Sequence, residues 1–405
     1  MSEHLYLTKE QARNFLFFKH GLKGEKRYIG KEGVMEFINS VGCIQFDPID
    51  VCGKNPELVL QSRVEGFKKE MLYELLYEDR RLLDHFDKSL AIYPVELWPY
   101  FRRVRDEFRE RGLKHQETKG IAAEVLEIIK AKGFVSSSDI GFNNTIEWDW
   151  GNKSKLSRAI LEVLYYQGDT IIHHKNGTRK YYALTDGLLE DTNFNHKDPF
   201  KDDHDFNKWR VLRRIEAIGL LWDKPSDAFL MIRNLKSKER IKIFHELHLE
   251  EKIIKVTVEG VKEPLYLSER DKAELEDSLK NNPLLERVEF LAPLDNLIWD
   301  RKLIKALYNF DYKWEIYTPA EQRKFGYYTL PVIRGNTFIG RIELLNQRKE
   351  KALLFKNIWL EEGISLDQDL CENLQVALER FKTFSDCKTL IDEKQILGNH
   401  INTGK

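Results

Sequence analysis

Residues Thr170–Leu184 read T-I-I-H-H-K-N-G-T-R-K-Y-Y-A-L and carry the plainest folding signal of the chain. Asn-Gly is the preferred dipeptide of a two-residue hairpin turn, because both turn positions need a positive φ angle. The runs on either side of Asn176-Gly177 contain β-branched and aromatic residues. The stretch therefore predicts a β-hairpin with strands at Thr170–Lys175 and Arg179–Leu184.

Helical patterns precede this hairpin. Apolar residues recur at helical spacing in Ile121–Ile129 and again in Leu156–Leu164. Between them, Ser136–Asp139 offers capping residues for a short second helix. Three helices followed by a hairpin is the order of a winged helix, in which the third helix enters a DNA groove and the hairpin forms the wing.

The same order returns upstream and downstream. Strand pairs begin near Leu82, Gly168 and Lys252, a spacing of roughly 85 residues, which indicates a repeated unit. We therefore expect winged helices at residues 1–115, 116–190 and 200–282, with the acidic stretch Asp186–Asp205 as a linker. The outer hairpins are predicted from the runs Leu82–His85, Leu90–Tyr93, Ile253–Val258 and Pro264–Leu267.

After Pro283 the pattern changes to short strands divided by turns. The predicted strands are Val288–Leu291, Trp314–Tyr317, Gly326–Val332, Phe338–Leu344 and Ala352–Trp359. They indicate a small β-barrel-like domain at 283–390, closed by a helix over Asp367–Phe384. The tail from Asp386 is expected to be loosely ordered. The predicted fold class is thus α+β: three tandem winged helices, then the barrel-like domain and its terminal helix.

Composition excludes several classes of protein. Of 405 residues, 42% are hydrophobic and 32% charged, as in a globular chain and not a disordered one. No apolar run approaches the roughly 18 residues that span a membrane, and the first residues lack a signal-peptide core. The four cysteines form no C-x-x-C pair, so we expect reduced thiols and a cytoplasmic, nucleoid-associated protein.

Charge is unevenly distributed although the net charge is only −1. Arg301–Lys356 holds 12 Lys/Arg against 5 Asp/Glu, and Arg102–Lys114 forms a second basic cluster. Local basic surfaces on a neutral chain suit a protein that binds a polyanion through one face. A solvated charged helix has the same composition, so this signal alone leaves both interpretations open.

The stretch Cys43–Pro48, C-I-Q-F-D-P, holds the candidate catalytic residues. It follows a helical pattern that closes at Gly42, a typical C-cap residue. Alternation then predicts a strand with Gln45 and Asp47 on one face and the apolar residues on the other. A carboxylate beside an amide suits the orientation of a water or the stabilisation of a cation. The same alternation occurs in any half-buried strand.

Three segments resemble the YcaQ/AlkZ family of winged-helix DNA glycosylases, which remove bulky alkylated bases and unhook interstrand crosslinks. Gln45-Phe46-Asp47 is similar to the catalytic motif of the YcaQ branch, whereas the AlkZ branch has glutamine at the third position. Phe290–Arg301, F-L-A-P-L-D-N-L-I-W-D-R, resembles a family signature. Trp314–Pro331, W-E-I-Y-T-P-A-E-Q-R-K-F-G-Y-Y-T-L-P, is the most specific match. One departure is Lys88, which stands where many members have histidine.

The resemblance implies a monofunctional glycosylase for N7-alkylguanine-type bases. An N7-alkylguanine is a good leaving group because it is already positive, so the demand falls on the oxocarbenium-like sugar and the attacking water. Asp47 would stabilise the cation and accept the proton, and Gln45 would hold the water. No lysine nucleophile is required, and an open cleft suits a crosslinked base that cannot rotate out.

The implied partner is double-stranded DNA that contains alkylated or crosslinked bases, bound by a monomer away from any membrane. The predicted phosphate contacts are Arg102, Arg103, Arg301, Arg323, Lys324 and Arg341. No metal or other cofactor is expected, because the histidines of His245-Glu246-Leu247-His248 lie at i, i+3, whereas the zinc motif places them at i, i+4. The alternatives are a non-catalytic winged-helix transcription regulator and a protein-interaction scaffold.

Overall fold

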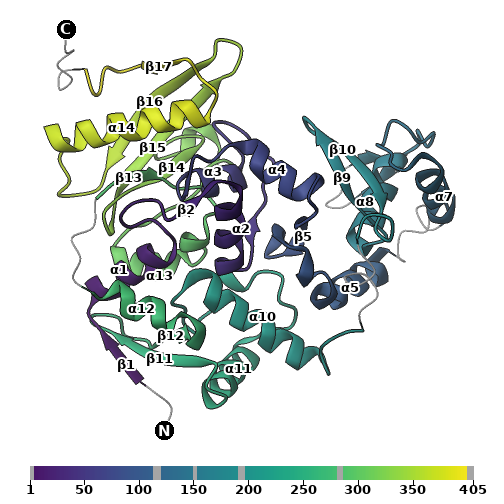
Figure 1. Cartoon of the computed structure of the whole chain (residues 1–405), viewed down its shortest axis with the longest axis horizontal. Helices are drawn as coiled ribbons and strands as arrows, with labels where there is room; N and C mark the ends of the chain where they lie inside the picture. The colour runs from purple at the N-terminus through teal and green to yellow at the C-terminus, as the bar shows by residue number, and fades with distance from the viewer. Residues whose placement is uncertain (1–3, 113–119, 149–152, 190–196, 281–285, 399–405) are drawn as a thin grey trace. The chain divides into compact units, whose positions relative to one another are not determined.

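The computed structural model describes residues 4–112, 120–148, 153–189, 197–280 and 286–398 (Figure 1). Its contacts divide the chain into two compact units. The larger unit joins Met1–Leu72 to His204–Lys405, and the smaller unit is the segment Tyr73–Asp203. These limits differ from the predicted boundaries near 115, 190 and 282. The four-domain division stays a prediction, since a folding module and a compact unit need not share their limits.

The smaller unit contains both of the hairpins predicted for it. Its helices are α5 (Arg102–Gly112), α7 (Ala122–Lys132) and α8 (Leu156–Gln167). Its strands pair as β5 (Leu82–Asp87) with β6 (Ser89–Pro94), β7 (Thr145–Glu147) with β8 (Lys153–Lys155), and β9 (Thr170–Asn176) with β10 (Arg179–Leu184). All three pairs are antiparallel, and the sequence did not predict the short pair β7–β8.

The core of the smaller unit lies between α7, α8 and the β9–β10 hairpin. Val125, Ile160 and Leu164 pack with Ile172 and Tyr182 in one buried cluster. These are the apolar positions that recur at helical spacing in α7 and α8, together with inward positions of the hairpin strands. The two predicted helices and the hairpin are therefore confirmed as elements.

The predicted short helix at Ser136–Asp139 is wrong. These residues form a turn, in which the Asp139 carboxylate accepts hydrogen bonds from the backbone N–H and the hydroxyl of Ser136, both 2.7 Å long. Aspartate and serine side chains compete in this way for the backbone groups that a helix needs. Part of the acidic stretch predicted as a linker, residues 190–196, lies outside the described residues.

The larger unit begins with β1 (His4–Leu7) and α1 (Lys9–Lys19), which opens with a capping box formed by Thr8 and Gln11. A short parallel pair and three helices follow: β2 (Tyr28–Ile29) with β4 (Val64–Glu65), then α2 (Gly30–Val41), α3 (Asn55–Gln61) and α4 (Lys69–Tyr77), whose end crosses into the smaller unit. Strand β1 pairs in parallel with β11 (Ile253–Val258), which pairs with β12 (Leu265–Ser268). The first and third predicted repeats thus share one sheet.

The remaining helices of the larger unit are α10 (Asp203–Ile218), α11 (Ser237–Leu249), α12 (Lys272–Ser278), α13 (Arg301–Tyr308) and α14 (Gln368–Phe384). Its last sheet, a half-barrel, is formed by β13 (Val288–Phe290), β14 (Thr329–Arg334), β15 (Thr337–Gln347), β16 (Ala352–Leu360) and β17 (Thr389–Asp392), in that order. The predicted strand at Trp314–Tyr317 is wrong, because this segment forms a turn. The fifth strand is instead β17, which pairs in parallel with β16 and lies in the tail expected to be loosely ordered.

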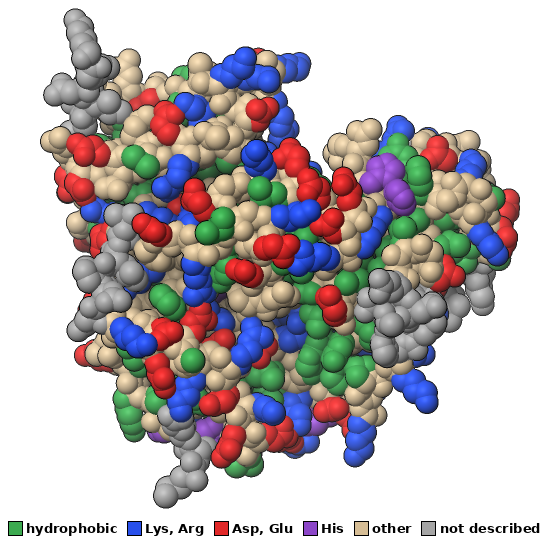
Figure 2. All heavy atoms as spheres, viewed as in Figure 1, with side chains coloured by type: hydrophobic (Ala, Val, Ile, Leu, Met, Phe, Trp, Pro, Cys, Tyr) green, Lys and Arg blue, Asp and Glu red, His purple; other side chains and the backbone are tan. Residues whose placement is uncertain are grey.

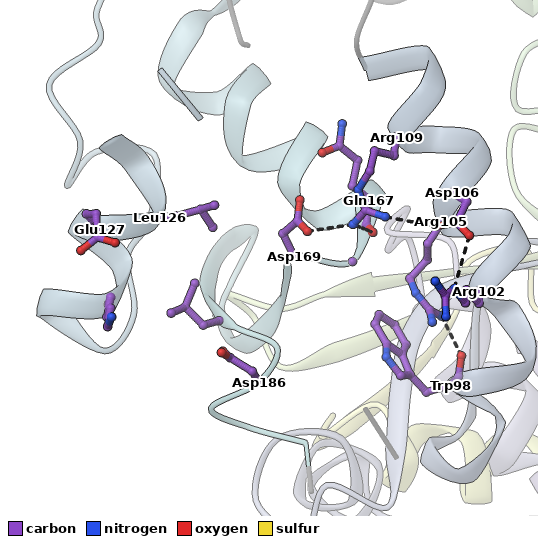
Figure 3. A pocket seen from close by; sticks show the side chains of 13 residues that line it. Trp98, Arg102, Arg105, Asp106, Arg109, Leu126, Glu127, Gln167, Asp169 and Asp186 are labelled. Atoms are coloured by element: carbon purple, nitrogen blue, oxygen red, sulfur yellow. Dashed lines mark hydrogen bonds and ion pairs between the residues drawn. The ribbon is translucent and has the colours of Figure 1, made fainter. Parts of the chain in front are cut away.

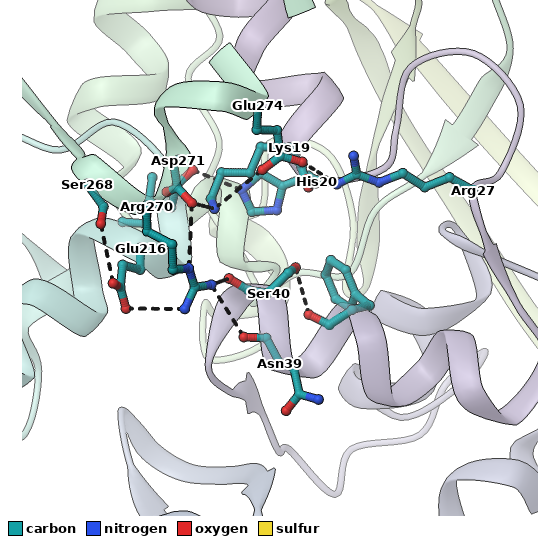
Figure 4. Close-up of polar contacts among 12 residues, drawn as sticks. Lys19, His20, Arg27, Asn39, Ser40, Glu216, Ser268, Arg270, Asp271 and Glu274 are labelled. Carbon is teal, nitrogen blue, oxygen red and sulfur yellow. Dashed lines mark hydrogen bonds and ion pairs between the residues drawn. The ribbon is translucent and has the colours of Figure 1, made fainter. Parts of the chain in front are cut away.

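A buried polar network joins α1 to α12 (Figure 4). Lys19 is fully buried, and its Nζ lies 2.8 Å from Oδ1 of Asp271. Glu274, the second acid near Lys19, also pairs with Arg27 at 2.5 Å. A buried lysine is held only where carboxylates compensate for its lost hydration. The network therefore fixes the end of α1 against the start of α12.

The chain is thus a mixed α+β protein whose two ends build one unit around an inserted segment. Within the residues that the structure describes, no helix is long and apolar enough to cross a membrane.

Candidate active site

The predicted catalytic segment begins where α2 ends. Gly42 closes the helix with φ at 77°, a conformation that favours glycine. The strand that follows, β3 (Ile44–Gln45), is only two residues long. Cys43, Ile44, Gln45 and Phe46 are all buried, with Gln45 8% exposed. The predicted alternation of apolar and polar faces is therefore wrong, because both faces of the segment are covered.

Side chains from distant parts of the larger unit hold the backbone of this segment. Within the segment, the carbonyl of Cys43 accepts a hydrogen bond from Asn296 (2.8 Å) and that of Gln45 accepts one from Asn55 (2.7 Å). Just before it, at the end of α2, the carbonyl of Ser40 accepts from Arg270 (2.6 Å) and that of Gly42 from Arg213 (3.1 Å). Alternate carbonyls of a strand normally find partners in a sheet. Here side chains of the larger unit add to such partners, so the position of the segment depends on several elements at once.

The signature Phe290–Arg301 provides much of this support. The side chain of Asn55 bridges β3 to the signature, because its Oδ1 accepts the N–H of Leu294 at 3.0 Å. Asp295 forms a completely buried ion pair with Arg63 at 2.7 Å. Trp299 and Asp300 are also buried, and Asp300 accepts the indole N–H of Trp222 at 2.6 Å. The signature is therefore a scaffold for the candidate catalytic segment.

Asp47 is half-buried just beyond β3. Its Oδ1 accepts the backbone N–H of Ile49 at 2.9 Å, the only hydrogen bond to this carboxylate among the described residues. Burial raises the pKa of the Asp47 carboxyl above its ordinary value, and the bond from Ile49 offsets part of the rise. A carboxylate with one oxygen fixed and the other without a partner can accept a proton from a bound water.

The charge of this carboxylate acts on a buried phenol. Burial raises the pKa of the Tyr328 hydroxyl well above its ordinary value, and nearby Cys52, Tyr312 and Asp47 raise it further. Burial also raises the pKa of Tyr312, which donates its hydroxyl to the carbonyl of Thr329 at 2.7 Å. Both tyrosines therefore remain neutral.

The loop before β14 belongs to the third family-like segment, Trp314–Pro331. The buried carboxylate of Glu315 accepts the backbone N–H groups of Lys324 (3.0 Å), Phe325 (2.9 Å) and Gly326 (3.3 Å). Burial alone raises the pKa of Glu315, but these three donors outweigh burial and lower the pKa. Glu315 therefore stays ionised and fixes the return of the loop.

Three of the predicted DNA contacts lie in or beside this loop. The guanidinium of Arg323 lies 4.9 Å from the ring centre of Tyr327, and the Nζ of Lys324 lies 5.0 Å from that of Phe325. Arg301 lies 5.6 Å from the ring centre of Tyr312. Among the described residues, none of these three cations forms an ion pair with a carboxylate. Their charge is therefore available to an anion.

Arg341 does not belong with them. It is 3% exposed, pairs with Glu361 at 2.5 Å and lies 3.9 Å from the ring centre of Phe325. The prediction that Arg341 contacts a phosphate is wrong, because its guanidinium is buried beneath the loop.

Arg102 and Arg103 lie at the start of α5. Arg102 pairs with Asp106 at 3.5 Å, and Arg103 pairs with Asp198 (2.7 Å) and Asp203 (2.6 Å). Helix α5 lines a cavity of about 560 Å³ (Figure 3). In this cavity too the arginines are paired with carboxylates, since Arg109 pairs with Asp106 and Asp169. Basic and acidic side chains are likewise mixed over the face shown in Figure 2.

Sequence reasoning missed the residues that position the catalytic segment. Asn296 falls within the signature, which was a usable signal, whereas nothing in the sequence around Asn55 marked it. Lys88, the departure from the family pattern, is 4% exposed at the turn between β5 and β6. Among the described residues, no three histidine, cysteine or carboxylate side chains gather as a metal ion would require.

The larger unit thus combines a half-buried carboxylate, on a segment held by side chains, with cations that face aromatic rings. The family described as "DNA glycosylase AlkZ-like" matches residues 38–384. The chain therefore belongs to the AlkZ-like DNA glycosylase family, whose members act in DNA repair. Its fold is similar to the solved structure of Streptomyces sahachiroi DNA glycosylase AlkZ, with a TM-score of 0.61 and 13% identity over 96% of this chain and 100% of that chain.

Proposed function

We propose that the protein is a monofunctional DNA glycosylase that hydrolyses the N-glycosidic bond of N7-alkylguanine-type bases, including bulky and crosslinked ones. The observation that carries the proposal is the Asp47 carboxylate, half-buried and with one oxygen unpartnered among the described residues, on a segment positioned by side chains. Such support holds a reacting group in one geometry before the substrate arrives.

Asp47 acts on the sugar and on the water. A positively charged base leaves readily, so the transition state resembles an oxocarbenium ion. The ionised carboxylate stabilises this cation electrostatically and takes a proton from the attacking water. Gln45 positions that water through its carboxamide, which both donates and accepts hydrogen bonds.

The DNA partner is a duplex that contains the alkylated or crosslinked base. We place phosphate contacts first at Arg301, Arg323 and Lys324, whose charges face aromatic rings. Arg102 and Arg103 on α5 contribute less, because carboxylates already match them. The hairpins β5–β6, β9–β10 and β11–β12 serve as wings of three tandem winged helices. The enzyme works as a monomer in the cytoplasm, associated with the nucleoid.

The deciding experiment is single-turnover excision of an N7-alkylguanine by Asp47→Asn. The substitution keeps the size of the side chain and removes its charge, so the variant should fold and bind DNA normally. We expect the rate of base release to fall by about 10²–10⁴-fold, the usual contribution of a positioned proton acceptor. Gln45→Ala should cost less, and the double variant should be non-additive because both residues act on one water.

Asp50→Asn is the matched control. Asp50 lies in the same loop, but Arg348 already pairs with it at 2.5 Å. Its amide variant should keep most of the activity. A rate within about twofold of wild type for Asp47→Asn would remove Asp47 from the mechanism, because a general base contributes at least about 10². It would also favour the non-catalytic regulator, provided that DNA binding persists.

The dependence of activity on pH gives a second test. Burial raises the pKa of Asp47, so the carboxyl is protonated and inactive at pH values where a free aspartate would already be ionised. Activity should therefore fall on the acid side at a higher pH than about 3.9, the ordinary value for aspartate. The Asp47→Asn variant should lose this acid limb, since it has no group there to titrate.

A further inference from the structure

An exposed tyrosine marks the loop that Glu315 holds. Tyr317 is 81% exposed, far more than its neighbours in the loop such as Trp314 and Tyr328. A single exposed aromatic residue is common on protein surfaces and needs no explanation by itself. Its position relative to Asp47 and its charged surroundings give Tyr317 its significance.

A row of rings runs inward from Tyr317. The ring of Tyr317 lies 6.1 Å from that of Trp314, edge to face, and the ring of Trp314 lies 5.8 Å from that of Tyr328. Tyr328, at the buried end of the row, is one of the groups on which the charge of Asp47 acts. Tyr317 therefore lies at most about three to four base-pair rises of 3.4 Å from Tyr328.

The surroundings of Tyr317 favour a polyanion with flat rings. Lys313 and Lys324 are exposed in the same loop, and Arg323 lies over Tyr327. Single strands of nucleic acid are bound in this way, by aromatic side chains that stack on bases and by cations that follow the phosphates. The three hydrogen bonds to Glu315 keep the loop in place, so the loop loses little conformational freedom when it binds a ligand.

We propose that Tyr317 stacks on an unpaired base next to the nucleotide under attack, with Trp314 supporting its ring and Lys313, Arg323 and Lys324 contacting the flanking phosphates. This proposal rests on the proposed function for the place of attack, but it concerns binding and not bond cleavage. An unpaired base arises wherever the duplex opens to expose the glycosidic bond, and its free π face is what Tyr317 can cover.

The test uses a duplex with a tetrahydrofuran abasic analogue, which cannot be cleaved, and the fluorescent base 2-aminopurine opposite or beside it. Wild-type protein should change the fluorescence at one of these positions, because stacking on an aromatic ring alters the emission of 2-aminopurine. Tyr317→Ala should abolish the change and weaken binding by about 5- to 150-fold, the range for one base–aromatic stack. The salt dependence of binding should stay the same, since no charge is removed.

Two further variants make the result specific. Tyr317→Phe keeps the ring and should restore both affinity and fluorescence change. Tyr6→Ala removes a tyrosine on β1 that is 74% exposed and should behave as wild type. Equal affinities for Tyr317→Ala and Tyr6→Ala, or a failure of Tyr317→Phe to restore binding, would overturn the stacking role. Failure of the proposed role of Asp47 would appear separately: the Asp47→Asn variant would excise the base at the normal rate, and the fluorescence change would be intact.

Discussion

The loop Lys313–Tyr328 and helix α5 both carry basic side chains, but different groups face these cations. In the loop, Arg323 and Lys324 face the rings of Tyr327 and Phe325. In α5, Arg102, Arg103 and Arg109 each pair with at least one aspartate.

The difference shows what a count of charges leaves out. An aromatic ring attracts a cation without neutralising its charge. A paired carboxylate, in contrast, cancels the electric field of the cation beyond a few ångströms. Two clusters of equal formal charge can therefore differ greatly in their attraction for DNA. The partner of each cation decides which cluster binds.

Substitution of Arg341, which is buried against the loop, should have the largest effect on stability. Its guanidinium lies between Phe310 and Phe325 and pairs with Glu361, so Arg341→Met removes a buried charge from beneath the loop. We expect the free energy of unfolding to fall by about 3 kcal/mol, the lower end for a broken buried pair, because Glu361 is partly hydrated. Chemical denaturation followed by circular dichroism measures the change.

Arg109→Met serves as the comparison from α5. Arg109 is 45% exposed, and an exposed ion pair contributes at most about 1 kcal/mol. Equal losses of stability in the two variants would show that Arg341 is not the buried support that its contacts indicate.

Salt dependence of DNA binding compares the two clusters directly. The double variant Arg323→Gln/Lys324→Gln should reduce the slope of log K against log salt by about 1.8, since each neutralised phosphate contributes about 0.9. Arg102→Gln/Arg103→Gln should change the slope less, because paired arginines release fewer counterions. Fluorescence anisotropy at several salt concentrations gives both slopes. A larger change in the α5 variant would reverse the ranking.

The smallest expected effect is on the free energy of unfolding, and it comes from His204, an imidazolium cation that two carboxylates of the larger unit hold. Hydrogen bonds to Glu239 and Glu246 raise the pKa of His204. Its contribution to stability is therefore fully present below the unfolded pKa, about 6.5, and is lost as the pH rises through the higher folded pKa. His204→Gln should cost about 1–2 kcal/mol at low pH and less at high pH. A pH-independent loss would contradict this assignment.

Local sequence patterns predicted the helices and strands better than they predicted which of these elements contact one another. The hairpin at Asn176-Gly177 was predicted correctly, because its turn depends on a few adjacent residues. Strand β17 was missed because its pairing with β16 is a long-range contact that the tail sequence does not reveal. Likewise, β1 pairs with β11 across about 250 residues of chain, and no periodicity reports such a partner.

The candidate site shows the same limit. Gln45 and Asp47 were identifiable by resemblance, but their burial was not, since it depends on Asn55 and Asn296 reaching from elsewhere. Arg341 was wrongly predicted to contact DNA because sequence spacing cannot tell a buried arginine from an exposed one. Tyr317 was placed in a strand because the turn is set by Glu315, whose three backbone partners lie about ten residues further along.

The division of the larger unit between the two ends of the chain has a consequence for synthesis. Ribosomes release the N-terminal end first, so Met1–Leu72 emerges long before His204–Lys405, which completes its core. The intervening Tyr73–Asp203 is continuous in sequence and can close its contacts while the rest is still being made. Strand β1 must wait for β11, with its edge unpaired and open to association with other chains. Slow translation or crowding of nascent chains should therefore increase the risk that β1 associates with another chain before β11 is made.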